Sequence, residues 1–160
     1  MFKIRSFEDS DYYEVRALFE RSLIEFSGNC ETAMLAYVQS SLCDDLMDIR
    51  KHYLDSSTDH FWVVEVDGVV KGMVGIQSTG DGNAELRRMS VDREMRRLGI
   101  GSKLLSVAED FCNELGYKRI LLTTVTLLVP AIALYENSGF VLQETESYGD
   151  IMGLHYMKTL

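Results

Sequence analysis

The sequence predicts an α/β domain in which seven strands and four helices follow the order β-α-α-β-β-β-α-β-α-β-β. Strand-like stretches, alternating or continuously apolar, recur along the chain, and stretches with apolar residues at helical spacing separate them. A turn with two closely spaced glycines joins one strand to one amphipathic stretch. With 160 residues, 46% of them hydrophobic, and one proline, we expect a single domain over residues 1–160.

The first third of the chain predicts one strand and two helices. Residues 2–7 alternate in polarity, and an amphipathic helix follows until the break at Ser27-Gly28-Asn29. A second helix is predicted from Glu31 to Tyr53. We interpret its apolar stripe as core packing, with a substrate pocket as the alternative: Met34, Leu35, Tyr37, Val38, Leu42, Leu46, Met47 and Ile49.

Three aspartates on this second helix predict a solvated face. They are Asp44, Asp45 and Asp48, and an acidic rim of this kind would attract a cationic amine.

The middle of the chain predicts three consecutive strands. Phe61–Val66 and Val69–Ile76 flank Asp67-Gly68, which is a strong hairpin signal. A second glycine turn, Gly80-Asp-Gly82-Asn, leads into a third strand over Ala84–Val91.

The last third predicts two helices and three strands. After the two glycines, an amphipathic helix runs to Gly116, which suits a helix C-terminus. A buried strand follows over residues 118–125, and Pro130 lies near the first turn of a short helix. Two strands close the chain, over residues 140–147 and 151–158.

The glycine turn carries a local excess of positive charge. Residues 87–103 hold six cations and two anions, whereas the whole chain has a net charge of −9. The turn reads Arg96-x-x-Gly99-x-Gly101, and the following helix presents unpaired N–H groups and a partial positive charge at its start. This pattern is typical of a site for a phosphorylated ligand, with an ordinary strand-to-helix turn as the alternative. It fits neither a Walker A loop nor a dinucleotide fingerprint.

Two motifs resemble those of the GNAT acetyltransferase superfamily. The turn after Val91-Asp92 matches [QR]-x-x-G-x-[GA], and residues 131–140 match A-x-x-L-Y-E-x-x-G-F. The stretch Glu85-Leu-Arg-Arg-Met-Ser-Val-Asp resembles the cysteine-conjugate and aspartate N-acetyltransferases. The resemblance implies the GNAT fold, a mixed central sheet with helices on both faces, and acetyl-CoA as co-substrate.

The resemblance also implies a cofactor site along the strand and the glycine turn. Met89 and Val91 would pair with the pantetheine arm through their backbone, and the N–H of Met89 or Ser90 would polarise the thioester carbonyl. The turn from Arg96 to Ser102 would bind the pyrophosphate. The residues expected to contact the cofactor are Met89, Ser90, Val91, Arg96, Arg97, Leu98, Gly99, Ile100, Gly101, Ser102 and Lys103.

Two catalytic residues follow from the resemblance. Tyr135 would protonate the departing thiolate, and packing is its alternative role. Glu85 would accept the proton of the amine, although a strand residue facing solvent is equally consistent with the sequence and relatives also use water. Relatives often carry asparagine where this chain has Leu128, so Thr123, Thr124 or Thr126 would supply that contact.

The predicted activity is acetyl transfer to a primary amine of a small molecule or a peptide. The alternatives are a non-catalytic acyl-CoA-binding module used for sensing, and an enzyme that uses a longer acyl-CoA. Many relatives pair through sheet edges or helices, so a homodimer is consistent with the family.

Composition argues against nucleic-acid-binding, membrane-spanning and metal-binding proteins. The acidic balance argues against nucleic acid as a partner, and no apolar run reaches the ~18 residues that a membrane span requires. The N-terminus reads as a strand, so we expect a cytoplasmic protein without membrane association. Three cysteines and three histidines show no metal-ligand spacing, and we expect Cys112 in the core and no metal.

Overall fold

The computed structural model describes all 160 residues, and its elements follow the predicted order. The predicted boundaries are met within a few residues, except in the second helix. The elements are β1 (Phe2–Ser6), α1 (Tyr12–Ile24), α2 (Glu31–Leu42), β2 (His60–Val66), β3 (Val69–Ser78), β4 (Ala84–Val91), α3 (Ile100–Glu114), β5 (Arg119–Val125), α4 (Val129–Asn137), β6 (Val141–Tyr148) and β7 (Ile151–Thr159).

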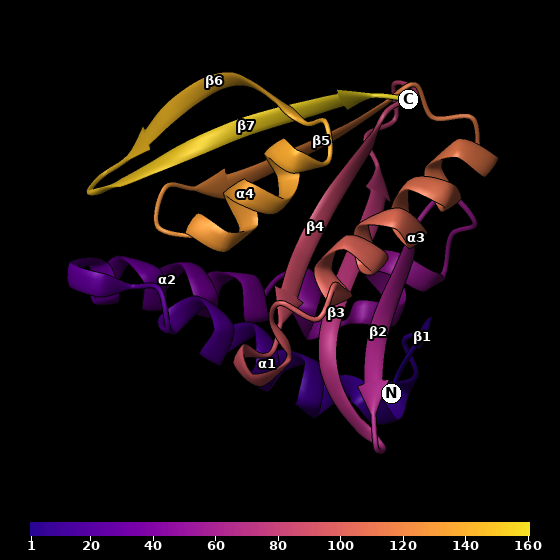
Figure 1. The fold of residues 1–160 in the computed structure, drawn as a ribbon, viewed down its shortest axis with the longest axis horizontal. Coiled ribbons are helices and arrows are strands. Elements are labelled where there is room, and N and C mark those ends of the chain that lie inside the picture. Colours follow the sequence, from indigo (N-terminus) through magenta and orange to yellow (C-terminus); the bar gives the residue numbers. More distant parts are fainter.

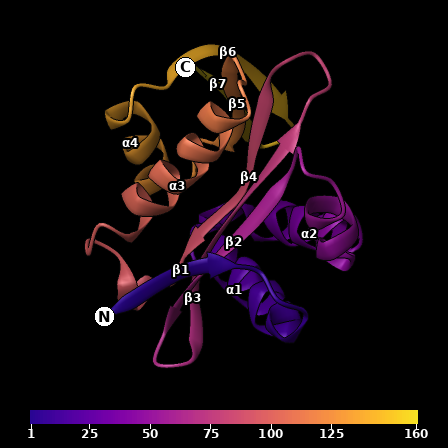
Figure 2. The ribbon, with the colours of Figure 1, turned by 90° about the vertical axis from the view of Figure 1, so that its right-hand side faces the viewer.

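The strands form one mixed sheet in the order β1-β2-β3-β4-β5-β7-β6. Only β4 and β5 run parallel, and every other neighbouring pair is antiparallel. Helices α1 and α2 lie on one side of the sheet, and α3 and α4 lie on the other (Figure 2). Each side has its own apolar cluster, so the sheet is buried on both faces over much of its area. The predicted mixed sheet with helices on both faces is confirmed.

The predicted second helix is wrong in its length. Helix α2 ends at Leu42, and a 3₁₀ turn (Asp45–Met47) and a π-helical turn (Arg50–Leu54) follow. Asp44 leaves the helical conformation with φ −103° and ψ −117°. This break directs the side chain of Asp45 into the interior. The prediction of a solvated Asp45 is therefore also wrong, because only 1% of the residue is exposed.

The apolar stripe of this region divides between core and surface. Leu35, Tyr37 and Met47 are exposed, whereas five of its members are buried: Met34, Val38, Leu42, Leu46 and Ile49. Cys112 is buried in the other cluster, as predicted. Burial raises the pKa of its thiol to about 12, so this cysteine stays protonated at neutral pH. No helix combines the length and the apolar character that crossing a bilayer requires.

Strands β4 and β5 separate soon after they begin. Their register holds two pairs, Ala84 with Ile120 and Glu85 with Leu121, and beyond these the strands diverge (Figure 1). Against β3, the register of β4 shifts between Met73 and Gly75, which leaves one extra residue on β4. Arg88 and Met89 thus lie opposite the single residue Val74, and the φ of Arg88, +59°, is unusual for a residue with a side chain.

The two glycines of the turn before α3 have different roles. Gly99 has φ +79°, a left-handed conformation that glycine adopts without steric strain. Gly101 lies inside α3, where a Cβ atom would come within 3.1 Å of Leu134 Cδ2 on α4. Gly99 therefore permits the turn, and Gly101 permits α3 and α4 to lie close together.

Candidate active site

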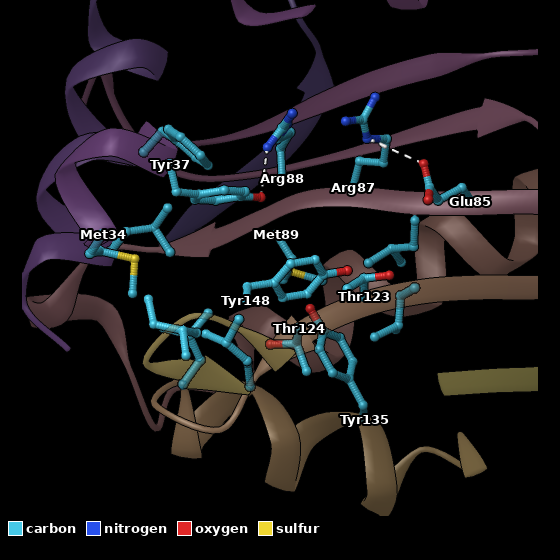
Figure 3. A pocket seen from close by; sticks show the side chains of 18 of the residues that line it. Met34, Tyr37, Glu85, Arg87, Arg88, Met89, Thr123, Thr124, Tyr135 and Tyr148 are labelled. Carbon is cyan, nitrogen blue, oxygen red and sulfur yellow. Dashed lines mark hydrogen bonds and ion pairs between the residues drawn. The ribbon is translucent and has the colours of Figure 1, made fainter. Parts of the chain in front are cut away.

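The opening between β4 and β5 contains a cavity of about 420 Å³. Its 19 lining residues come from α1, α2, β4, β5, α4 and the end of the β6–β7 hairpin, and 14 of them are hydrophobic. Figure 3 shows Met89, Thr124, Tyr135 and Tyr148 around the same space. A mostly apolar cavity with a few polar groups, in a gap of a sheet, is typical of a small-molecule site.

One wall of the cavity is an edge of β4 that has no strand partner. Pairing with β5 ends at Glu85, so Met89, Ser90 and Val91 lie on the part of β4 that faces the gap. The side chain of Met89 lines the cavity, whereas Ser90 is buried and its Oγ accepts a hydrogen bond from Ser22 Oγ at 3.1 Å. An extended chain in the gap would find free backbone groups along this edge.

Helix α3 begins beyond the end of β4 with unpaired amide groups. Lys103 N donates to Gly99 O at 3.1 Å, which is the first bond of the helix. The N–H groups of Ile100, Gly101 and Ser102 therefore have no partner within α3. The turn and the first helical residues thus have the backbone arrangement of an anion site.

The basic side chains near the turn are in different environments. Arg97 and Lys103 are exposed. Arg96 Nη1 lies 2.5 Å from Glu25 Oε2, and the Arg96 guanidinium lies 4.8 Å from the ring centroid of Phe26. Arg96 therefore bridges the turn to the end of α1.

Arg87 and Arg88 belong to the cavity and not to the glycine turn. Arg88 forms a bidentate ion pair with Asp45, at 2.6 Å and 3.0 Å, and also donates to Tyr37 Oη and Ser41 Oγ at 3.0 Å each. Both members are buried, with side-chain exposures of 5% and 1%. Burial alone would raise the pKa of Asp45, but the Arg88 guanidinium outweighs it and the pKa is lowered. The local positive charge at the turn is therefore smaller than the sequence suggested.

Tyr135 lies on α4 with its hydroxyl directed into the cavity (Figure 3). The residue is 5% exposed, and its ring packs edge-on against Phe140 at a centroid distance of 5.8 Å. Burial raises the pKa of the phenol, so Tyr135 is protonated at neutral and alkaline pH. In this state the group can donate a proton.

Glu85 borders the same cavity from β4, next to Arg87. Arg87 Nε lies 3.3 Å from Glu85 Oε1, and Arg87 Nη1 donates to Gln77 Oε1 at 2.8 Å. The Glu85 side chain is 39% exposed. It therefore combines both predicted environments, since it is partly solvated and it lines the cavity.

Several alternatives that the sequence left open concern residues at the cavity. Met34 and Tyr37 of α2 line it, so the alternative interpretation of the apolar stripe fits these two residues. Thr123, Thr124 and Leu128 also line it, and Thr126 does not. Thr123 Oγ1 forms a 2.9 Å hydrogen bond with Nδ1 of His155, a histidine that no motif marks. No group of three or more histidine, cysteine, aspartate or glutamate side chains is arranged to hold a metal ion.

Comparisons with known proteins agree on one family. The model of the Acetyltransferase (GNAT) family matches residues 16–140. N-acetyltransferase 8 of Homo sapiens is 38% identical over 109 residues, which are 65% of this chain and 48% of the relative. The N-acetylaspartate synthetase of Danio rerio is 38% identical over 117 residues, which are 72% of this chain and 42% of the relative. The chain thus spans about half the length of these relatives.

A solved structure supports the fold over the whole chain. PaiA N-acetyltransferase from Thermoplasma acidophilum, in complex with coenzyme A, aligns with a TM-score of 0.83 and 16% identity. The alignment covers 100% of this chain and 99% of that one. At this identity the likeness concerns the fold.

Proposed function

The chain belongs to the GNAT acetyltransferase family, and from this premise we propose that it transfers an acetyl group from acetyl-CoA to a primary amine. The observation that carries the proposal is the opening between β4 and β5, with Tyr135 on its wall. The unpaired edge of β4 borders this opening, and the unpaired amides at the start of α3 lie beyond the end of β4. The acceptor is a small molecule or a peptide terminus.

In this proposal, backbone groups hold the cofactor. The edge of β4 from Met89 to Val91 pairs with the pantetheine arm, and the N–H of Met89 or Ser90 polarises the thioester carbonyl. The turn from Arg96 to Ser102 and Lys103 bind the pyrophosphate. Acetyl-CoA supplies the activated acyl group, and the protein positions it and handles the protons.

The proposed proton steps involve two side chains that line the cavity, Glu85 and Tyr135. The ammonium group of the acceptor loses a proton, for which Glu85 is a candidate base, and the free amine attacks the thioester carbon. A C–N bond forms, the C–S bond breaks, and Tyr135 donates its proton to the departing sulfur. Because burial raises the pKa of Tyr135, the phenol keeps this proton until the thiolate forms.

Arg87 favours an acceptor that carries a carboxylate besides its amine. Its recorded hydrogen bonds and ion pairs use Nε and Nη1, which leaves Nη2 for a ligand. A guanidinium binds carboxylates well, and in a mostly apolar cavity such a contact would also orient the acceptor. The relative named N-acetylaspartate synthetase is consistent with this class of acceptor.

The direct test is thiol release from acetyl-CoA with a panel of amines. The panel contains amino acids including aspartate, amino-acid conjugates, polyamines and peptides, and a parallel series replaces acetyl-CoA by longer acyl-CoA thioesters. We expect release with acetyl-CoA and at least one carboxylate-bearing amine. Tight coenzyme A binding without any release would favour the non-catalytic sensing alternative, and a faster rate with longer thioesters would replace the acetyl assignment.

The pyrophosphate assignment predicts that Arg97→Glu weakens coenzyme A binding about tenfold, which corresponds to about 1.4 kcal/mol. Arg97 is the suitable position because it is exposed, whereas reversing Arg96 would place two carboxylates beside each other at Glu25. Isothermal titration at low and high salt measures the effect, which should shrink as salt screens the charges.

Arg119→Glu is the matched control for this charge reversal. Arg119 is also exposed, but it begins β5 after the far end of α3. Helix α3 has 15 residues and is therefore about 22 Å long, which exceeds the screening length in physiological salt. Equal affinities for wild type and Arg97→Glu would contradict the assignment of the turn to the pyrophosphate.

A further inference from the structure

His155 lies on β7 on the same face of the sheet as the cavity. The register places Thr123 of β5 opposite His155, and Glu144 of β6 opposite it on the other side. Glu85 is opposite Leu121, two residues before Thr123 on β5. A row of polar side chains therefore crosses the sheet from the edge strand β6 to the site where β4 and β5 separate.

The imidazole of His155 lies between a hydroxyl and a carboxylate. Its Nδ1 is 2.9 Å from Thr123 Oγ1, and its Nε2 is 3.7 Å from Glu146 Oε1. Nε2 is buried and has no hydrogen bond. A proton on Nε2 faces the carboxylate, so this tautomer is favoured. Nδ1 is then the acceptor of the Thr123 hydroxyl.

Thr123 connects this histidine to the cavity. It is exposed, it lines the cavity, and it follows the last β4–β5 pair by two residues. Figure 3 shows Thr123 at the cavity, beside the ring of Tyr148. Thr123 therefore joins His155 to the cavity in which the proposed reaction takes place.

We propose that Thr123 and His155 form a proton relay that removes the proton of the acceptor amine, an inference that rests on the proposed acetyl transfer. The Thr123 oxygen accepts the ammonium proton while its own proton passes to His155 Nδ1. The result is a free amine, a neutral threonine and an imidazolium whose Nε2–H faces Glu146. The amine then attacks the thioester carbon, and His155 later returns its Nδ1 proton to solvent through the hydroxyl of the exposed Thr123.

The charged side chains around the ring come from β6. Glu144 and Glu146 of β6 share its face, and Tyr148 at the end of the hairpin packs over Gly153 on β7. On the β5 side, the neighbours on this face are the uncharged Leu121 and Thr123. Glu85, in contrast, already has Arg87 as its ion-pair partner.

The test is the pH dependence of kcat/KM for the acceptor between pH 5 and 9. In the wild type we expect activity to fall at acid pH, because a relay that already holds a proton cannot accept another from the ammonium group. His155→Gln should lower kcat/KM about a hundredfold at neutral pH and abolish this acid limb. Thr123→Val should do the same, and Thr123→Ser should retain the wild-type profile.

The possible outcomes distinguish a failure of the proposed relay from a failure of the proposed acetyl transfer. An acid limb that survives in both His155→Gln and Thr123→Val overturns the relay and leaves the proposed function intact. Loss of the limb in Glu85→Gln alone would assign the base to Glu85 and also overturn it. A wild type that releases no thiol with any amine overturns the function and the relay together. Thr123 is exposed, so Thr123→Val decides the matter if His155→Gln does not fold.

Discussion

Replacing Tyr135 with phenylalanine is expected to lower turnover of acetyl-CoA about a hundredfold while coenzyme A still binds. The substitution removes the hydroxyl that faces the cavity and keeps the ring that packs against Phe140. A thiol with a pKa near ~8.5 is a moderately good leaving group even without a proton donor. We therefore place the loss at the lower end of the range for general acid catalysis. Single-turnover rates and a coenzyme A titration measure the two quantities.

Tyr156→Phe is the matched control for this variant. Tyr156 is also buried, but its hydroxyl donates to Glu136 at 2.8 Å and it does not line the cavity. Turnover should stay close to that of the wild type. If Tyr135→Phe kept full activity, the tyrosine would serve only in packing and solvent would protonate the thiolate.

The raised pKa of Tyr135 also predicts the alkaline behaviour of the wild type. An unperturbed tyrosine loses its proton near pH ~10, and burial moves this loss to higher pH. The proton needed by the thiolate is therefore present at every pH below about 10. A decline of the chemical step between pH 8 and 9 that Tyr135→Phe removes would contradict the raised pKa, because it would show that this phenol loses its proton in that range.

The fold was predictable because its signals are local in the sequence. The hairpin at Asp67-Gly68, the turn before α3 and the periodicity of the strands each depend on a few neighbouring residues. The element order and the mixed sheet are confirmed, and the family model confirms the resemblance to GNAT acetyltransferases. The relatives also agree with the aspartate N-acetyltransferase branch.

The candidate site was predictable only where motifs mark it. Tyr135 and the turn before α3 carry recognisable patterns, and the roles assigned to them remain predictions. The pairing of Thr123 with His155 joins residues 32 positions apart, and no local signal in the sequence indicates that they pair. The end of α2 was missed for a similar reason. Its helical spacing continues past Leu42, but a tertiary contact of Asp45 with Arg88, 43 residues away, interrupts it.

That tertiary contact makes Asp45→Asn the substitution with the largest expected effect on stability. It leaves the Arg88 guanidinium buried without a counter-charge, and breaking a buried pair in this way typically costs 3–5 kcal/mol, so we expect a loss of about 4 kcal/mol. For a domain of this size, the midpoint of thermal unfolding should fall by about 10 °C. Asp44→Asn is the control, since Asp44 is exposed and its loss should change stability by less than about 0.5 kcal/mol.

A double mutant distinguishes the stability contributed by the ion pair from the cost of leaving one of its charges unpaired. Asp45→Asn combined with Arg88→Met removes both charges, and apolar replacement of a buried pair is often neutral, so most of the lost stability should return. An equal loss in the single and double mutants would mean that the buried charge is not the cause. The double mutant should still bind coenzyme A more weakly, because Arg88 also anchors the irregular backbone of β4 through Tyr37 and Ser41.

The pH dependence of the Asp45→Asn effect follows from the lowered pKa of Asp45. In the unfolded chain this carboxyl titrates near ~3.9, and in the folded protein Arg88 holds the pKa below that value. The ionised carboxylate therefore contributes its full stability above about pH 5, and this contribution disappears as the pH falls through the folded pKa. Chemical unfolding of both proteins at pH 7 and at pH 3 should give a large difference at neutral pH and a smaller one in acid. A constant difference would show that the substitution acts through packing and not through the charge of Asp45.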